Sequence, residues 1–213
     1  MNLPRSMRWL SAVLTVVAAT ATAQTVSLPT APDAVEEDWV LVVGTPDPQG
    51  VGPQITTAMS PVSDNSTPFV AFDIDYVEFP SFSPGGMQLQ VWSGETVLAT
   101  ASQGNALFNT PGETVSWTQR MSLSGGNVNY TINNGASVTW GNFGQGATLT
   151  VSYPSSLTSL SGYSPTVSAT KSGVSWEENL VTSLTLKQIR YYANGQLIAT
   201  DTTPRVLVNN TTN

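Results

Sequence analysis

The feature that most constrains this chain is a period-two alternation of apolar and polar residues, interrupted by glycine-containing turns. It is clearest in residues 117–143, where segment 127–132 (NVNYTI) places every second residue on an apolar face. Such alternation is typical of a half-buried antiparallel strand. Gly125-Gly126 and Asn134-Gly135 offer the positive φ angles of tight hairpin turns. We therefore expect a three-stranded meander here, with Asn134-Gly135 at a hairpin tip.

The same signals recur along most of the chain. Asn194-Gly195 predicts a second tight hairpin, and no segment shows the pattern of a helix of three turns. Trp176–Leu180 suggests one helical turn at most. About a dozen short strands without helices indicate an all-β, antiparallel two-sheet sandwich. The other strands are expected at Trp39–Gly44, Gln54–Ser60, Pro68–Phe79, Met87–Trp92, Thr96–Ala101, Val115–Leu123, Thr148–Tyr153, Thr166–Ala169, Val181–Tyr192, Gln196–Asp201 and Arg205–Val208.

The first 23 residues have the layout of a secretory signal peptide. Arg5 and Arg8 precede an apolar run, and Ala21-Thr22-Ala23 is a small-x-small cleavage site. We expect cleavage after Ala23 and a secreted, periplasmic or extracellular product; an uncleaved anchor is the alternative. Residues 24–37 are then a flexible arm, 38–208 a single β-sandwich domain, and 209–213 a polar tail.

Composition excludes several functions. The chain has 7 basic and 14 acidic residues, and loss of Arg5 and Arg8 would leave a net charge of −9. So acidic a surface disfavours nucleic acid and anionic lipid, which need Lys and Arg. No segment after the signal is long enough to span a membrane. With no His and no Cys, the chain cannot form Ser-His-Asp or Cys-His catalytic sites, zinc sites of the usual kind or disulfides.

The end of the chain adds an architectural signal. The hairpin NNGASVTWGNF is followed by a strand, a Ser-rich loop and SLTLKQIRYYANGQLIATD. This order resembles the concanavalin A-like lectin/glucanase jelly roll, over residues 69–201. The resemblance implies a jelly-roll sandwich and a carbohydrate ligand.

One short motif is similar to a catalytic strand of glycoside hydrolase family 16, which has this fold. The family pattern is E-x-D-x-x-E, and this chain reads D-x-D-x-x-E over Asp73, Asp75 and Glu78. The resemblance implies that the outer carboxylates act as nucleophile and acid. Asp73 stands where Glu is expected, and Glu78 joins the other two only if a β-bulge lies near residues 76–77. Retaining hydrolysis needs carboxyls about 5–5.5 Å apart. On an open strand face both would keep ordinary pKa values, so a retaining β-glucanase is the alternative reading, and we lean towards no enzyme.

A binding surface is the preferred interpretation. If the strands at 68–79 and 87–92 are neighbours, one face gathers Asp73, Asp75, Gln88, Gln90 and Trp92. Amides and carboxylates bind sugar hydroxyls, and an indole packs against a pyranose ring. An ordinary solvated sheet face is the alternative. Trp39, Trp117 and Trp140 each continue an apolar stripe and are expected in the core.

The acidic loops raise the question of calcium. Oxygen ligands are available, but no EF-hand spacing exists and we expect no cofactor; a solvated acidic arm is favoured over a Ca²⁺ site. The candidates are Asp33, Glu36, Glu37, Asp38, Asp64, Asn65 and Asp201. The sequence thus favours an exported, non-enzymatic module that binds a neutral glycan or a cell-surface component. A hydrolase and a structural component of an envelope or matrix are the alternatives.

Overall fold

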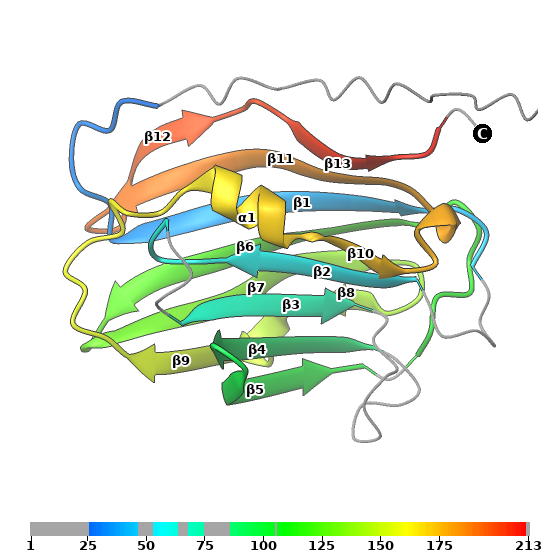
Figure 1. The fold of residues 1–213 in the computed structure, drawn as a ribbon, viewed down its shortest axis with the longest axis horizontal. Helices are drawn as coiled ribbons and strands as arrows, with labels where there is room; N and C mark the ends of the chain where they lie inside the picture. The colour runs from blue at the N-terminus through cyan, green and yellow to red at the C-terminus, as the bar shows by residue number, and fades with distance from the viewer. Residues whose placement is uncertain (1–25, 47–52, 64–67, 75–85, 105, 212–213) are drawn as a thin grey trace, which may run out of the picture.

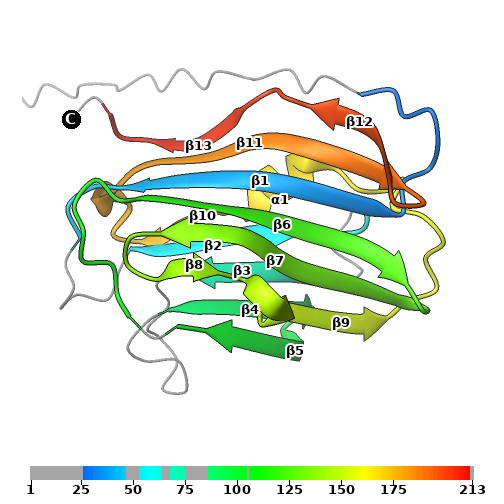
Figure 2. The same cartoon turned by 180° about the vertical axis from the view of Figure 1, so that it is seen from behind.

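The structure is a computed structural model, and it describes residues 26–46, 53–63, 68–74, 86–104 and 106–211. Two antiparallel sheets pack face to face, which confirms the predicted all-β sandwich (Figures 1 and 2). Sheet A has the order β12-β11-β1-β6-β7-β8, with β13 beside β11 and β9 beside β7. Its strands are β1 (Ala34–Val43), β6 (Thr114–Ser124), β7 (Asn127–Ser137), β8 (Gly141–Phe143), β9 (Thr150–Pro154), β11 (Val181–Ala193), β12 (Gln196–Asp201) and β13 (Arg205–Asn209).

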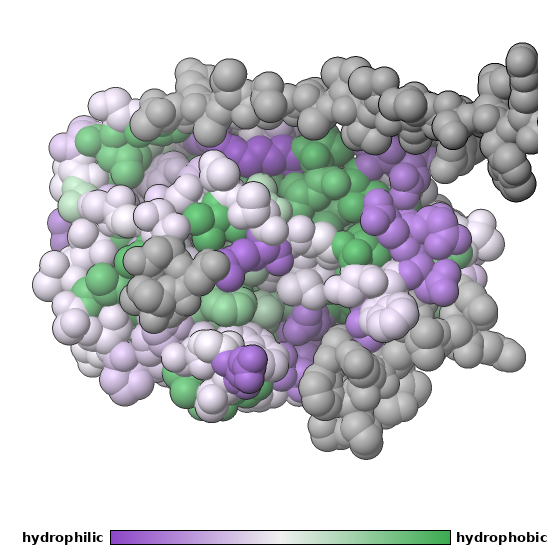
Figure 3. All heavy atoms as spheres, in the orientation of Figure 1, coloured by the Kyte–Doolittle hydropathy of each residue, from purple (hydrophilic) through white to green (hydrophobic). Residues whose placement is uncertain are grey.

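Sheet B forms the second layer, in the order β10-β2-β3-β4-β5. Its strands are β2 (Gln54–Met59), β3 (Phe69–Ile74), β4 (Met87–Ser93), β5 (Thr96–Gln103) and β10 (Gly173–Trp176). On its outer side, apolar patches are interrupted by polar side chains (Figure 3). The described residues also form two 3-10 turns, η2 (Gln145–Ala147) and η3 (Glu178–Leu180), and η3 agrees with the expected single helical turn.

The core lies between the sheets and is built around large aromatic rings. Trp39 of β1 and Trp117 of β6 are 0% and 2% exposed, and their rings stack with centroids 6.3 Å apart. Phe72 of β3 packs edge-on against Trp117 from the facing sheet, at 5.8 Å. Trp39 and Trp117 are therefore core residues, as predicted, while Trp140 is only partly buried against the core.

β1 begins earlier than the sequence suggested. The arm predicted at 24–37 ends by residue 33, because Ala34 already pairs with Tyr192 of β11 and Ser122 of β6. Val35 and Glu37 face the core, where both are 0% exposed. The sequence did not indicate this part of the strand, because the buried Glu37 interrupts the expected series of apolar residues.

The segment predicted as a strand at Thr166–Ala169 is a short helix. α1 (Pro165–Lys171) begins with Pro165 in its first turn, where the missing N–H of proline costs no hydrogen bond. The helix contacts β2 and lies in the same layer as sheet B (Figure 1). Ser168 is fully buried on its inner side. α1 therefore extends the cover that sheet B gives to sheet A.

Asn134-Gly135 is not a hairpin tip, and that prediction was wrong. Both residues lie inside β7, and the four residues of β7 from Asn133 to Ala136 lie opposite only three of β6, from Ser116 to Thr118. This is a β-bulge, and the positive φ of Asn134 (53°) belongs to it. The hairpin that follows turns at residues 138–140 and joins β7 to β8, so the third strand of the predicted meander begins only at Gly141. Gly125-Gly126 does form the predicted turn between β6 and β7.

Several predictions fall outside the described residues. These include the signal peptide and its cleavage after Ala23, Asp64 and Asn65, the bulge expected at 76–77, and both Asp75 and Glu78. Among the described residues, no helix is long and apolar enough to cross a membrane.

The second predicted hairpin is present and offers a simple stability test. Asn194 and Gly195 have φ angles of 50° and 75° and join β11 to β12. A Cβ on Gly195 would meet nothing within 4 Å, so we expect Gly195→Val to act mainly through the strained backbone. We expect a loss of about 1 kcal/mol in the free energy of unfolding, measured in urea. Thr200→Val on the exposed face of β12 is the control, and an unchanged midpoint for Gly195→Val would contradict the turn assignment.

Candidate functional site

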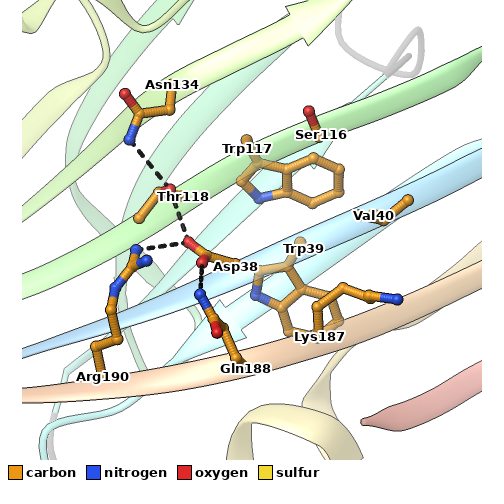
Figure 4. A pocket seen from close by; sticks show the side chains of 10 residues that line it. All are labelled: Asp38, Trp39, Val40, Ser116, Trp117, Thr118, Asn134, Lys187, Gln188 and Arg190. Atoms are coloured by element: carbon orange, nitrogen blue, oxygen red, sulfur yellow. Dashed lines mark hydrogen bonds and ion pairs between the residues drawn. The ribbon is translucent and has the colours of Figure 1, made fainter. Parts of the chain in front are cut away.

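A polar hollow opens on the outer face of sheet A. Side chains alternate along β1, so Glu36, Asp38 and Val40 face outward while their neighbours face the core. The hollow has a volume of about 510 Å³, within the range of small-ligand sites. It is lined by Asp38, Trp39, Val40, Ser116, Trp117, Thr118, Asn134, Lys187, Gln188 and Arg190 (Figure 4).

Asp38 is the centre of this site. Thr118 Oγ1 and Arg190 Nη2 both donate to its Oδ1 at 2.8 Å. Gln188 Nε2 donates to its Oδ2 at 2.6 Å, and Asn134 Nδ2 donates to Thr118 Oγ1 at 3.3 Å. The strand register explains this gathering, because Asp38 lies directly opposite both Gln188 and Thr118. One row of side chains thus crosses β11, β1, β6 and β7 (Figure 4).

A second row of paired charges lies beside the first. Arg120 Nη1 contacts Glu36 Oε1 at 2.5 Å, and Arg190 Nε contacts Glu36 Oε2 at 3.0 Å. Tyr192 OH also donates to Glu36 Oε2, at 2.8 Å. Burial raises the pKa of Glu36, but the hydrogen bonds and the two guanidinium groups outweigh it, so the pKa is lowered overall. Arg190 bridges Glu36 and Asp38, and this fixes the side chains of both rows.

The hydrogen bonds leave some groups available to a ligand. Among the described residues, Gln188 Oε1, Asn134 Oδ1, Ser116 Oγ and Lys187 Nζ have no hydrogen-bonding partner. Both acceptors and donors are represented, and all four residues line the hollow. The site can therefore bind a polar ligand without first breaking its own network.

The residues that the sequence placed in a binding face lie on sheet B. The two strands that carry these residues are neighbours, as the predicted face requires, since Asp73 pairs with Gln88 and Ala71 pairs with Gln90 across β3 and β4. Asp73, Gln88 and Gln90 are only 7%, 7% and 8% exposed, and Trp92 is partly exposed and donates to Gln90. These residues share a face, but most of their polar surface is covered. Asp75 lies outside the described residues.

Asp73 also differs from the open-face expectation for a carboxyl. Burial raises its pKa to about 6, against the opposing hydrogen bond from Thr56 Oγ1 at 2.6 Å. The expectation that it keeps an ordinary pKa was wrong, because its side chain is buried rather than exposed. With a pKa of about 6, Asp73 is mostly ionised at neutral pH and protonated in mild acid, and only the ionised form could act as the nucleophile that the hydrolase resemblance implies. The geometry toward Asp75 and Glu78 lies outside the described residues.

The calcium candidates do not gather into one place among the described residues. No group of three or more acidic side chains there is arranged to hold a metal ion. Glu37 faces the core, while Glu36 and Asp38 face outward and are paired with arginines. Asp201 is paired with Arg205 at 2.6 Å. The acidic run of β1 is thus engaged in protein contacts.

A second hollow, of about 570 Å³, lies where β5 approaches β9. Its lining contains no charged residue and no amide: Pro68, Leu98, Ser152, Tyr153, Pro154, Ser155, Ser156 and Leu157. It therefore offers fewer directional groups for a polar ligand than the hollow on sheet A.

Sequence reasoning missed the hollow on sheet A because its residues are far apart in the chain. A signal was present in β11, where Gln188, Arg190 and Tyr192 alternate with buried residues. It was also present in β1, where Glu36 and Asp38 flank Glu37. What the sequence did not reveal is that β1 pairs with both β11 and β6, which brings these stripes together.

Comparison with known proteins adds little. No protein-family model matches the sequence, and no curated protein matches it. Among solved structures, the chain is similar to a Scytalido-glutamic peptidase crystallised with a peptide-based transition state analogue, at 11% identity, with 86% of each chain covered and a TM-score of 0.36. At that TM-score the likeness carries no argument about chemistry, and the sandwich is established by the strand pairing itself.

Proposed function

We propose that this protein is a non-enzymatic, exported binding module whose ligand is a glycan, held in the hollow on the outer face of sheet A. The observation that carries the proposal is the row of fixed side chains around Asp38, which leaves Gln188 Oε1, Asn134 Oδ1 and Ser116 Oγ facing an open hollow of about 510 Å³. Sugar hydroxyls donate and accept hydrogen bonds, and such a mixed set of groups matches them.

A third row of residues, on the side of the Asp38 row away from Glu36, supports a sugar rather than a wholly polar ligand. Val206, Thr185, Val40 and Ser116 lie in register across β13, β11, β1 and β6. Val206 is 58% exposed, and Val40 lines the hollow. A pyranose has hydroxyls at its edge and C–H groups on its faces, so it would contact both rows at once.

The same contacts argue against catalysis at this site. Glu36 and Asp38 each accept three hydrogen bonds, and the lowered pKa of Glu36 keeps it ionised at neutral pH. Acid–base catalysis by two carboxyls needs one of them protonated at working pH. The concanavalin A-like jelly roll resembled by residues 69–201 is consistent with a sugar-binding role and remains part of this proposal.

Binding of the mature protein to a polysaccharide panel tests the proposal. We expect Gln188→Met to weaken binding about threefold to tenfold, because a lost hydrogen bond contributes about 0.5–1.5 kcal/mol. Ser116→Ala should have a smaller effect in the same direction. Gln196→Met, on the exposed start of β12, is the matched control and should bind like wild type.

Three outcomes would contradict the proposed function or the proposed position of the site. Loss of binding in Trp92→Ala, with Gln188→Met unaffected, would place the site on sheet B at Asp73, Gln88 and Gln90. Release of reducing sugar from β-glucans that Glu78→Gln abolishes would establish the hydrolase alternative. Absence of binding to every polysaccharide would leave a surface-interaction or structural role and refute the glycan proposal.

A further inference from the structure

Resting on the proposed function, we propose that the glycan carries a carboxylate and that Lys187 binds it. The hollow on sheet A would then select an acidic, uronate-containing polysaccharide over a neutral one. This departs from the neutral glycan that the overall composition suggested.

The argument begins with the charges on this face. Glu36 and Asp38 are matched by Arg120 and Arg190 through three ion pairs, so these four charges balance one another. Lys187 makes no ion pair with any described residue, although it lines the same hollow. One positive charge on this surface is therefore left without a partner.

The backbone explains why Lys187 lies there. Asp38 pairs with Gln188 and the next residue, Trp39, pairs with Leu186, so β11 has one extra residue at this point. Leu186 faces the core and is 0% exposed, whereas Gln188 faces the hollow. The β-bulge therefore adds Lys187 to the edge of the hollow without displacing either neighbour (Figure 4). Bulges commonly re-aim a side chain next to a functional site.

The chemistry favours a carboxylate on a sugar. The free groups of Gln188, Asn134 and Ser116 match hydroxyls, and the ammonium of Lys187 adds a charge-assisted hydrogen bond to an anionic oxygen. A uronate residue presents both kinds of group on one ring. The net charge of −7 repels polyanions in general, so preference for an acidic glycan requires a local cation. That preference should fall as salt screens the pair.

The test uses ligands that differ only in charge. Polygalacturonate, alginate and glucuronoxylan are each compared with their carboxyl-reduced, neutral forms, at low and at physiological salt. We expect wild-type protein to bind at least one acidic form fivefold or more tighter than its neutral counterpart at low salt, with a smaller ratio at physiological salt.

The chain offers a matched control, because Lys187 and Lys171 are its only lysines. Lys171 lies on α1 in the other layer, with its ammonium 4.1 Å from the centre of the Phe69 ring. Lys187→Gln should abolish the preference for the acidic form, so that the acidic and the neutral form bind with similar affinity. Lys171→Gln removes the same charge and should keep the preference.

The outcomes separate this inference from the proposed function. Equal binding to acidic and neutral forms, or equal losses in Lys187→Gln and Lys171→Gln, would overturn the role of Lys187 while the glycan site stands. Failure to bind any form would overturn both.

Discussion

Replacing Gly135 with alanine should lower the free energy of unfolding by about 3 kcal/mol, the upper end of the usual cost of overpacking a core. Gly135 lies in the β-bulge of β7, where an added Cβ would overlap ring atoms of Phe143, including Cγ. Phe143 is 0% exposed and packs against Phe72 and Trp140. The ring cannot move aside without disturbing these neighbours.

Urea or thermal unfolding of Gly135→Ala measures the effect, and Gly173→Ala is the control. Gly173 is also a strand glycine, in β10, but its Cβ would meet nothing within 4 Å. Neither glycine has a positive φ, so the comparison isolates steric overlap. Gly135→Ala as stable as Gly173→Ala would show that Phe143 can repack and would refute the close contact.

Gly135 also shows a limit of prediction from local sequence. Asn134-Gly135 has the composition of a tight turn, and local composition cannot distinguish a turn from a bulge with the same positive φ. The distinction comes from packing, because Gly135 is needed beneath Phe143. The true turn at 138–140 is stabilised by Glu113, whose carboxylate accepts from Ser137 Oγ and from the backbone and hydroxyl of Thr139. Nothing in the local sequence indicates that distant carboxylate.

Predictions that depended on alternation alone were largely successful. The strands around Phe72, Leu89 and Leu184 follow their period-two patterns, and Asn194-Gly195 forms the expected hairpin. Two classes of feature were missed. The short α1 is stabilised by its contact with β2, and its isolated sequence resembles a strand. The hollow around Asp38 exists because three strands that are distant in sequence become neighbours, and no single segment carries that information.

Glu37 is a carboxylic acid at a core-facing position of β1, where the alternating pattern predicts an apolar residue. Its burial should make the stability of the protein depend on pH. Its carboxyl is fully buried between the layers, where Tyr163 OH donates to Oε1 at 2.5 Å and Trp39 Nε1 donates to Oε2 at 2.9 Å. Burial raises its pKa from 4.5 to about 7, although these hydrogen bonds and the charge of Arg205 act in the opposite direction. Glu37 is therefore partly protonated in the folded protein at neutral pH.

A raised pKa in the folded state makes stability fall as pH rises. Between 4.5 and about 7 the folded protein binds more protons at Glu37 than the unfolded chain does, so its contribution to stability is fully present below 4.5 and lost as pH passes about 7. The two pKa values correspond to a loss of about 3 kcal/mol. Asp73, with a pKa raised to about 6, acts in the same direction at slightly lower pH.

The free energy of unfolding, measured in urea from pH 5 to pH 8, tests this directly. We expect wild-type stability to fall across that range, and Glu37→Gln to remove most of the fall, because Gln retains an acceptor for Trp39 or Tyr163 but cannot ionise. Asp73→Asn should remove only the smaller part below pH 6.5 or so and leave the decline near pH 7 intact. A Glu37→Gln protein with the wild-type pH slope would mean that Glu37 keeps one protonation state from pH 5 to pH 8 and does not cause the decline.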